Sequence, residues 1–426
     1  MSKDQANSPA MLLFTGNPAK LAQSIFQMNL PEDVLRSLPA QTLYMAILHN
    51  GMESSAETIQ AASLAQVKLI LDLDLWQDDT FLEDNFWHWL ELEDATEPLR
   101  IAQKLLKVFD YKLVALIIGR YVDVITMSDQ SDTPPGEGFY TPDLGFTWIK
   151  VNLQDQHKYF LLNRLMALLF ETDADLFYQV LAAPSVSTGT ILEEEAFLDQ
   201  RRRLAAEGIP DTELASEIHR PMTLREFTIQ FKNQEYYTPI VDLDIIPALI
   251  AFSDELQPWF SVLQGTNNVE ELALEATYIT NSAIVFFKIA PSDLKRVALL
   301  AAQVRGAINL GFEIAQANQE APLSEIVAKI GLKPFYQLGL EKLFQARKQS
   351  YLLTKASDFE TKPIEQQVLI KALGGLFPAI PEAFDSATGQ IASHEGRIQQ
   401  GIKAIEKNSE LESALKVLGE NQPPTH

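Results

Sequence analysis

The stretch Thr190–Pro221 reads TILEEEAFLDQRRRLAAEGIPDTELASEIHRP, and its start and stop signals predict a long helix. Thr190 and Glu193 match the capping box S/T-x-x-E, in which the two residues satisfy backbone amides at a helix start. Gly208 stands where a helix commonly ends in a left-handed residue. We therefore expect a helix over Ile191–Gly208, followed by a second helix within the same stretch.

The charges of this helix are ordered along its axis. Glu193–Glu195 come first and Arg201–Arg203 come last, as the helix dipole favours, and Asp199 precedes Arg203 at the spacing of an ion pair. On this interpretation the charge run is the solvated surface of a well-capped helix. The alternative is a site for an acidic partner or a phosphate, which a guanidinium binds in a bidentate manner. Four side chains are candidates for that site: Glu194, Glu195, Arg201 and Arg202.

The same stretch resembles the signature of an uncharacterised bacterial family of mostly helical proteins, known only as a domain of unknown function. The matching elements are an acidic run, an arginine step and a turn, at Glu193–Ala196, Arg201–Leu204 and Gly208–Asp211. Further stretches similar to the same family lie at Leu38–Asp79, at Val304–Glu313 and at Leu332–Leu343. The resemblance implies a helical fold and no particular activity.

Short amphipathic helices joined by very short turns fill the N-terminal third. Prolines follow Leu30 and Leu38 at two helix starts, Ser63 can cap a later helix, and a further helix is expected over Tyr111–Ile125. Such repetition is typical of a helical solenoid. Residues 30–125 are similar in pattern to the superhelical cytosolic domain of MgtE-type magnesium transporters.

The composition changes after this region. Ser128–Gly138 is a loop sequence, and Phe139–Leu153 predicts a β-hairpin because aromatic and β-branched residues flank a Pro-Asp-Leu-Gly turn. Helical periodicity then continues to a last helix at His394–Leu418. The fold class is therefore mainly α, with one small hairpin. The expected divisions are a loose N-terminus at 1–16, a short-helix superhelical region at 17–127, a linker and β-hairpin at 128–158, a helical bundle at 159–421 and a tail at 422–426.

Two long helices are expected in the bundle, at Ser292–Ala317 and at Pro334–Thr354, and each contains a glycine. A glycine inside a helix costs about 1 kcal/mol relative to alanine, which a helix tolerates where another backbone approaches closely. Gly311 and Gly339 are therefore expected to be helix-crossing points. Arg305, on the first of these helices, is a candidate for a functional pocket.

Bulk composition excludes several classes of protein. The formal net charge is −23, so the chain as a whole repels nucleic acid and anionic membrane surfaces. The chain has no cysteine, which excludes disulfides, thiol nucleophiles and cysteine-ligated metal centres. Its N-terminus lacks a signal-peptide pattern, and no apolar run reaches about 18 residues. We therefore expect a cytoplasmic protein without transmembrane segments or nucleic-acid partners.

Motifs of the common catalytic and metal sites are missing from the sequence. No HExxH, GxSxG, Walker A or GxGxxG pattern occurs. The acids within Asp72–Asp79 lack the glycine and the later glutamate of a calcium loop, so we expect them to be solvated at a helix end, beside a buried Trp76. No cofactor, metal or catalytic residue is therefore expected.

Repeated short helices, acidic charge and missing catalytic motifs favour a non-enzymatic, intracellular interaction or scaffold protein that binds a partner protein through a helical groove. Trp87 and Trp89 belong to an aromatic cluster whose spacing favours the core, with a place in that groove as the alternative. The competing hypothesis is an enzyme, or a binder of a small ligand or anion. Its polar pocket between helices would use Glu194, Glu195, Arg201, Arg202 and Arg305.

Overall fold

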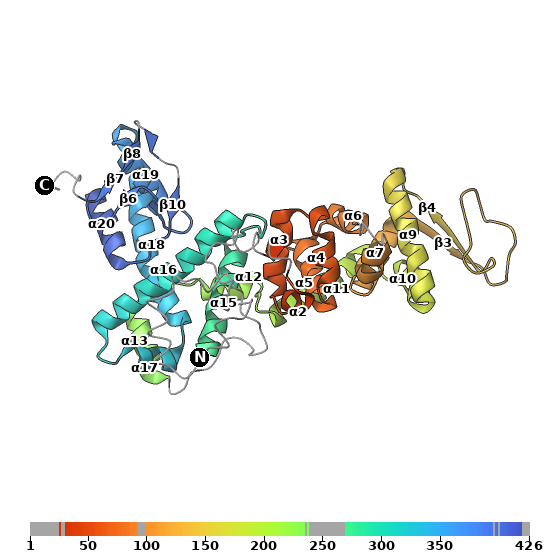
Figure 1. Ribbon diagram of the computed structural model, residues 1–426, viewed down its shortest axis with the longest axis horizontal. Coiled ribbons are helices and arrows are strands. Elements are labelled where there is room, and N and C mark those ends of the chain that lie inside the picture. The colour runs from red at the N-terminus through yellow and green to blue at the C-terminus, as the bar shows by residue number, and fades with distance from the viewer. Residues whose placement is uncertain are drawn as a thin grey trace. The chain divides into compact units, whose positions relative to one another are not determined.

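The protein is mainly helical, as its sequence predicts (Figure 1). The computed structural model describes residues 25–26, 30–92, 99–234, 237, 269–394, 397–398 and 401–419. The chain divides into two compact units, which we name the N-terminal unit (residues 28–204) and the C-terminal unit (residues 205–426 with the first 27). The linker and hairpin expected at 128–158 lie inside the N-terminal unit. The N-terminus expected at 1–16 and the tail expected at 422–426 lie outside the described residues.

Short helices form the first half of the N-terminal unit. Its elements are α2 (Glu32–Arg36), α3 (Ala40–Asn50), α4 (Ala56–Ala61), α5 (Leu64–Asp74), β1 (Trp76–Gln77), β2 (Thr80–Phe81), α6 (Glu83–Glu91) and α7 (Leu99–Leu106). Ser63 caps α5 as predicted, because its hydroxyl accepts the Gln66 amide at 3.1 Å and the Gln66 side chain accepts the Ser63 amide at 2.8 Å. The Gln66 side-chain amide also donates to the carbonyls of Leu35 and Leu38, which ties α5 to the end of α2.

The second half of the N-terminal unit combines longer helices with one strand pair. Its elements are α8 (Tyr111–Tyr121), β3 (Val122–Thr126), β4 (Thr147–Val151), α9 (Gln156–Thr172), α10 (Ala174–Val186) and α11 (Gly189–Ala206). β3 and β4 are antiparallel, with Val122 opposite Val151 and Thr126 opposite Thr147. A 20-residue loop, 127–146, joins the two strands.

Of the hairpin predicted within 139–153, β4 is present, but the strand that pairs with it lies outside that range. The partner of β4 is β3, which the sequence had placed at the end of a helix, and Tyr140 contributes only an isolated bridge to Ile149. β3 reads VDVIT and is β-branched at every position except Asp123. Such residues lose side-chain freedom in a helix and pack well on a pleated surface, so pairing with β4 is favoured over another helical turn.

The C-terminal unit is built around two long helices. Its helices are α12 (Thr212–Ile218), α13 (Leu224–Asn233), α15 (Val269–Phe286), α16 (Leu294–Asn318), α17 (Leu323–Ile330), α18 (Lys333–Thr354), α19 (Ile364–Leu373) and α20 (Asn408–Gly419). A Cβ at Gly311 would collide with the carbonyl oxygen of Phe335, and one at Gly339 with that of Ala307. The backbones of α16 and α18 therefore touch at these two points (Figure 1), and the predicted crossing at both glycines is confirmed.

The helix expected at His394–Leu418 was wrong in its described residues before Asn408, and correct from there on, where α20 (Asn408–Gly419) lies. Short strands occupy this end of the chain: β5 (Ile380–Pro381), β6 (Phe384–Asp385), β7 (Gln390–Ile391), β8 (Ser393–His394), β9 (Arg397–Ile398) and β10 (Ile402–Lys403). β10 pairs with β5, and the carbonyl of Gly401 accepts the Glu382 amide at 2.9 Å. Gly401 weakens a helix at this point, so the backbone pairs with β5 and only α20 is helical.

α16 is long and apolar enough to cross a membrane when it is judged by length and composition alone. However, 67% of that apolar window is buried inside the C-terminal unit. The helix packs chiefly on α18 and α15. This is the environment of a buried core helix.

Candidate functional site

The helix that carries the charge run, α11, begins two residues earlier than its sequence indicates. The Thr188 carbonyl accepts the amides of Ile191 and Leu192, and α11 starts at Gly189. Thr190 therefore lies inside the helix, and the capping box predicted for it and Glu193 is not formed. Glu193 instead pairs with Arg120 of α8 at 3.2 Å.

One arginine of the run points into the N-terminal unit, and it is Arg203. Its Nε lies 2.6 Å from Asp72 Oδ2 and its Nη2 lies 2.8 Å from Asp72 Oδ1 on α5. The Asp72 side chain is 6% exposed, so the pair is largely removed from water. Burial raises the pKa of the Asp72 carboxyl, and the Arg203 guanidinium opposes that rise. The predicted pairing of Arg203 with Asp199 was wrong, because Asp199 pairs with Lys112 at 2.6 Å.

The four side chains predicted for an anion site do not converge on a pocket. Arg202 is 78% exposed and pairs with Asp199 at 3.1 Å, and Arg201 lies over the Phe197 ring at 5.6 Å. Glu194 and Glu195 are exposed on the same helix. The pocket of about 330 Å³ beside α11 is lined by Arg120, Thr190 and Glu193, among others, and by none of the four.

Trp87 and Trp89 lie in the core of the N-terminal unit, with 1% and 0% of their surface exposed. Trp89 Nε1 donates to Asp74 Oδ2 at 2.8 Å, and the Tyr44 hydroxyl donates to Asp74 Oδ1 at 2.7 Å. The two rings are therefore not accessible to a partner. Asp72 and Asp74 are also not solvated as expected, since Asp72 is buried and Asp74 is half-buried and each is hydrogen-bonded to other side chains. Trp76 is buried as predicted. Within the described residues, no group of three or more His, Asp or Glu side chains could hold a metal ion.

Arg305 is buried in α16, with 7% of its surface exposed, and it lines a pocket of about 770 Å³ in the C-terminal unit. The other charged groups around this pocket are Lys295, Arg296, Lys403, Glu382, Glu406 and Glu410. The structure thus places Arg305 in a pocket wall of the C-terminal unit, whereas the α11 charges with which the sequence had grouped it belong to the N-terminal unit.

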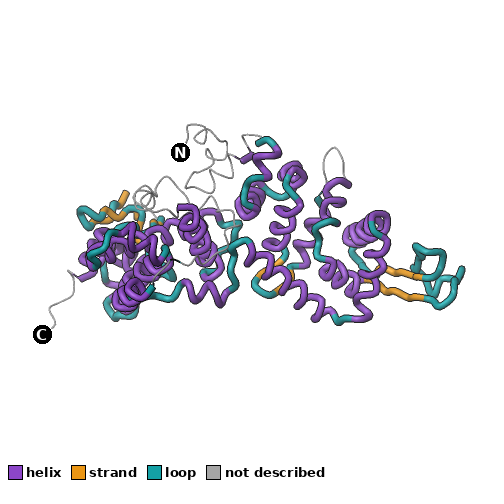
Figure 2. Tube along the Cα trace, turned by 90° about the horizontal axis from the view of Figure 1, so that it is seen from below, coloured by secondary structure: helices purple, strands orange, loops and turns teal. Residues whose placement is uncertain are grey.

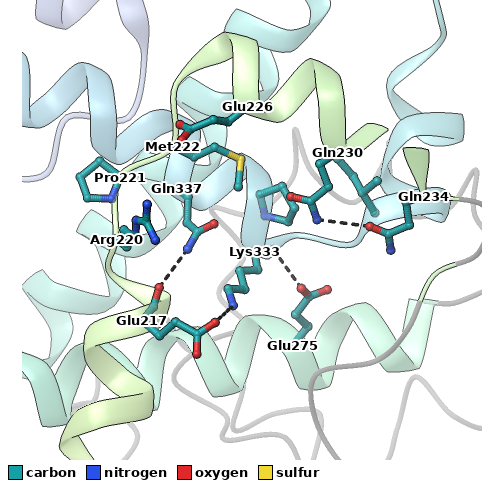
Figure 3. A pocket seen from close by; sticks show the side chains of 12 residues that line it. Glu217, Arg220, Pro221, Met222, Glu226, Gln230, Gln234, Glu275, Lys333 and Gln337 are labelled. Carbon is teal, nitrogen blue, oxygen red and sulfur yellow. Dashed lines mark hydrogen bonds and ion pairs between the residues drawn. The ribbon is translucent and has the colours of Figure 1, made fainter. Parts of the chain in front are cut away.

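A polar pocket that sequence reasoning missed lies among α12, α13, α15, α17 and α18 of the C-terminal unit (Figure 3). Its volume is about 410 Å³. Its charged lining groups are Glu217, Arg220, Glu226, Glu275 and Lys333, and three glutamines add amide groups: Gln230, Gln234 and Gln337. We name it the Glu275 pocket, because Glu275 is its most buried ionisable side chain.

Glu275 belongs to α15 and is 1% exposed. Its side chain lies against the start of α18. Its carboxylate accepts the amides of Leu332 at 2.8 Å and Lys333 at 2.9 Å, and the Tyr237 hydroxyl at 3.0 Å. Burial raises the pKa of the Glu275 carboxyl, and these three hydrogen bonds oppose the rise. Since α18 has no capping side chain of its own, Glu275 serves as its N-terminal cap from another helix.

The remaining inward-pointing groups of the pocket also join helices. Lys333 pairs with Glu217 at 3.2 Å, and the Gln337 side chain donates to the carbonyls of Glu217 and Ile218 (Figure 3). Behind them, the Tyr336 hydroxyl lies 2.5 Å from His219 Nδ1. A general base needs an oxygen within reach of its substrate, and both Glu275 oxygens already accept hydrogen bonds. The pocket therefore fastens α12 and α15 to the start of α18.

A strand pair with a long loop carries six of the exposed large apolar side chains of the N-terminal unit. We name residues 122–160 the β3–β4 arm, since they comprise β3, the 127–146 loop, β4 and the first turn of α9. The strands and loop project from the helices of this unit (Figures 1 and 2). Six large apolar side chains of the arm are exposed: Ile125 36%, Tyr140 39%, Leu144 77%, Phe146 45%, Tyr159 43% and Phe160 59%.

The arm has its own hydrogen-bond framework. Asp143 accepts the Thr147 amide at 2.7 Å and the Tyr178 hydroxyl at 3.1 Å, which fixes the loop to α10. The Tyr140 hydroxyl donates to Asn163 of α9 at 3.2 Å, and partial desolvation of this side chain, which is 39% exposed, raises the pKa of Tyr140 to about 12. The exposed apolar groups are therefore held in place on an ordered surface.

The arm is also acidic. Five carboxylates lie between residues 122 and 151: Asp123, Asp129, Asp132, Glu137 and Asp143. Lys150 is the one Lys or Arg in the same stretch of sequence. The surface that carries the apolar groups is therefore negatively charged.

Comparison with known proteins gives a family and no activity. No curated protein matches the chain, and no solved structure matches it. The similarity of residues 30–125 to MgtE-type transporters therefore stays a prediction. A family model matches residues 6–418, nearly the whole chain, and its description is a family of unknown function, DUF6178. The chain belongs to this family of unknown function, as the Glu193–Asp211 signature had indicated.

Proposed function

We propose that this protein acts by binding another protein rather than by catalysis, and that the β3–β4 arm is its docking surface. The observation that carries the proposal is the gathering of six exposed, large apolar side chains on one ordered arm. Single exposed apolar residues are ordinary on protein surfaces, but a group on one element is typical of interaction sites. The proposal keeps the interaction role that the sequence favours and moves it from the buried Trp87 and Trp89 to the arm.

The charge of the arm indicates the chemistry of the partner. The arm, residues 122–160, carries six carboxylates and two lysines, Lys150 and Lys158. This charge favours a basic segment, because complementary charge speeds association and disfavours acidic competitors. Leu144 and Phe160 are the most exposed apolar side chains of the arm, and they are suited to contact apolar side chains of that segment. We therefore propose a basic protein segment with interspersed apolar side chains as the partner.

The strand edge of the arm supports an extended binding mode. In the part of the chain that the structure describes, β3 pairs only with β4. Its other edge is then open to a further strand, the arrangement by which many domains add an extended peptide to a sheet. Asp123 and Ile125 of β3 are exposed, and they would contact alternate residues of such a peptide.

The test compares two matched double variants of the full-length chain as baits in a lysate of the source organism. In the arm variant, Leu144→Ser and Phe160→Ser remove two exposed apolar groups. In the control, Leu352→Ser and Ile364→Ser remove groups of similar exposure, 61% and 65%, from the C-terminal unit. Quantitative mass spectrometry should recover a basic protein with the wild type and the control, and at least tenfold less of it with the arm variant.

Two results would contradict this proposal. One is that every protein enriched by the wild type is retained by the arm variant. The other is that no protein exceeds the background of a blank matrix. Raised salt should weaken a true complex. Salt screens the attraction between exposed charges, and the screening length is already as short as about 10 Å at 0.1 M ionic strength.

A further inference from the structure

An apolar hollow of about 580 Å³ lies on the surface of the C-terminal unit, at a different place from the Glu275 pocket. The end of α15, one face of α16, α19 and the segment after α19 form its walls. Its main apolar lining residues are Phe287, Ile289, Leu299, Leu300, Leu376 and Phe377. Volumes of about 300–1,000 Å³ and mostly apolar walls are typical of small-molecule sites.

The hollow combines a buried floor with an exposed apolar rim. Phe287 and Phe377 are buried, and their ring centroids are 5.2 Å apart. Leu376 is 60% exposed and Ile402 is 44% exposed. An apolar ligand would remove this rim from water, which is favourable in proportion to the area covered.

The charged groups of the hollow have one sign. Among the residues that the structure describes, Arg296 on α16 and Lys371 on α19 are the ionisable side chains that line it, and no carboxylate does. Arg296 lies 3.4 Å from Asp293, but its side chain is 71% exposed, so this pair is weak. Lys371 lies over the Phe359 ring at 5.5 Å. In a chain with a net charge of −23, an apolar hollow whose charged groups are both basic selects for an anion.

We propose that this hollow binds a single-chain anionic amphiphile, with an aliphatic tail on the floor and an acid group at the rim. The tail would contact Phe287, Leu300 and Phe377. The acid group would accept hydrogen bonds from the Arg296 guanidinium, whose planar fork matches a carboxylate or a phosphate, and from the Lys371 ammonium. This site is independent of the β3–β4 arm, so either proposal can fail without the other.

Isothermal titration of the full-length protein with four probes tests the ligand class. The probes are laurate, dodecyl phosphate, dodecyltrimethylammonium and acetate. The three probes with a twelve-carbon tail are used below their critical micelle concentrations. At least one of the two anionic dodecyl probes should bind with one-to-one stoichiometry, and the tighter of the two identifies the acid group. The cation with the same tail and the anion without a tail should each bind at least tenfold more weakly. Equal binding of the anionic and cationic dodecyl probes would overturn the proposal, as would no binding of either anion.

Variants at exposed positions then locate the site. Arg296→Glu and Lys371→Glu should each weaken the tighter anion at least fivefold, whereas Lys348→Glu, an exposed reversal on α18, should leave its affinity unchanged. Leu376→Ser should also weaken binding, with Leu352→Ser as the matched control of similar exposure. Circular dichroism checks that each variant is folded. Equal affinities for the site variants and their controls would show that the probe binds elsewhere and would overturn the assignment.

Discussion

Asp72 in the N-terminal unit and Glu275 in the C-terminal unit are both buried carboxylates, but the two units stabilise them differently. Asp72 receives the guanidinium of Arg203 through two hydrogen bonds. Glu275 receives two backbone amides at the start of α18 and the Tyr237 hydroxyl. Asp72 therefore depends mostly on the side chain of Arg203, with a smaller contribution from Lys68. Glu275 depends mostly on two backbone amides, which among substitutions at those positions only proline removes.

Arg203→Ala should have the largest effect, because it leaves the Asp72 carboxylate buried without its guanidinium. Removing one partner of a buried ion pair typically lowers the free energy of unfolding by about 3–5 kcal/mol. Arg203 is itself 30% exposed, so we expect the lower end of that range. Hydrogen exchange of peptides from α5 and α11 during urea unfolding measures the change. Arg202→Ala is the control, and an equal loss in both variants would contradict the inward role of Arg203.

Glu275→Ala should have the next largest effect. It leaves the amides of Leu332 and Lys333 without their acceptor, and each unsatisfied buried group costs about 1–3 kcal/mol. We expect a loss of about 2–4 kcal/mol, and roughly half as much for Glu275→Gln, which keeps one acceptor oxygen. Exchange of the first amides of α18 reports the change directly. If the alanine and glutamine variants lose the same stability, the capping role of Glu275 is refuted.

The pH dependence adds a third buried group to the comparison. Burial lowers the pKa of His219 to about 4 from the ordinary value of 6.5. The unfolded chain then takes up the proton more readily than the folded chain as the pH falls. The contribution of His219 is fully present above pH 6.5 and is lost as the pH falls toward 4, by about 3 kcal/mol in total.

Urea unfolding at pH 7 and at pH 4.5 measures this loss in the C-terminal unit. His219→Gln should remove that part of the pH dependence, whereas His157→Gln, at a side chain that is 62% exposed, should keep it. If His219→Gln keeps the full pH dependence, the loss of stability at low pH comes from other ionisable groups and the prediction is wrong.

The smallest effect is expected on the solvated face of α11. Glu194→Gln and Arg202→Gln should each change the free energy of unfolding by no more than about 0.5 kcal/mol, since exposed ion pairs contribute little. Thermal unfolding measures both variants. A loss above about 1.5 kcal/mol in either would mean that this face makes contacts beyond those described, and would return it to consideration as a site.

The helical spacing of apolar residues and the start and stop signals of helices predicted much of the fold. α18 begins one residue before the helix expected at Pro334–Thr354 and ends at the same residue, and the glycines of α16 and α18 marked their crossing. β3 was missed because it follows α8 without a break, and only its pairing with β4 decides the conformation. Chain termini and the segment around 235–268 are not among the described residues, so predictions there stay predictions.

The candidate sites were harder to predict because each depends on which face of a helix is buried. On α11 the buried stripe is Leu192, Ala196, Gln200 and then Arg203, spaced by four, four and three residues. That spacing can be read in the sequence, but the prediction for α11 relied on the run of charges instead. Similarly, Glu275 follows Leu272 by three and precedes Ile279 by four, so it lies on an apolar stripe. The β3–β4 arm needed the tertiary structure, because sequence alone does not show which apolar residues stay exposed.

The crossing of α16 and α18 restricts how the C-terminal unit can move. Backbone touches backbone at Gly311 and at Gly339, with no side chain between them. Sliding either helix by one residue would place Leu310, Phe312, Leu338 or Leu340 at the contact, and their side chains do not fit there. Rotation about either contact would open the other, because the two contacts lie four residues apart on each helix. The crossing therefore holds both the axial register and the crossing angle of the two helices.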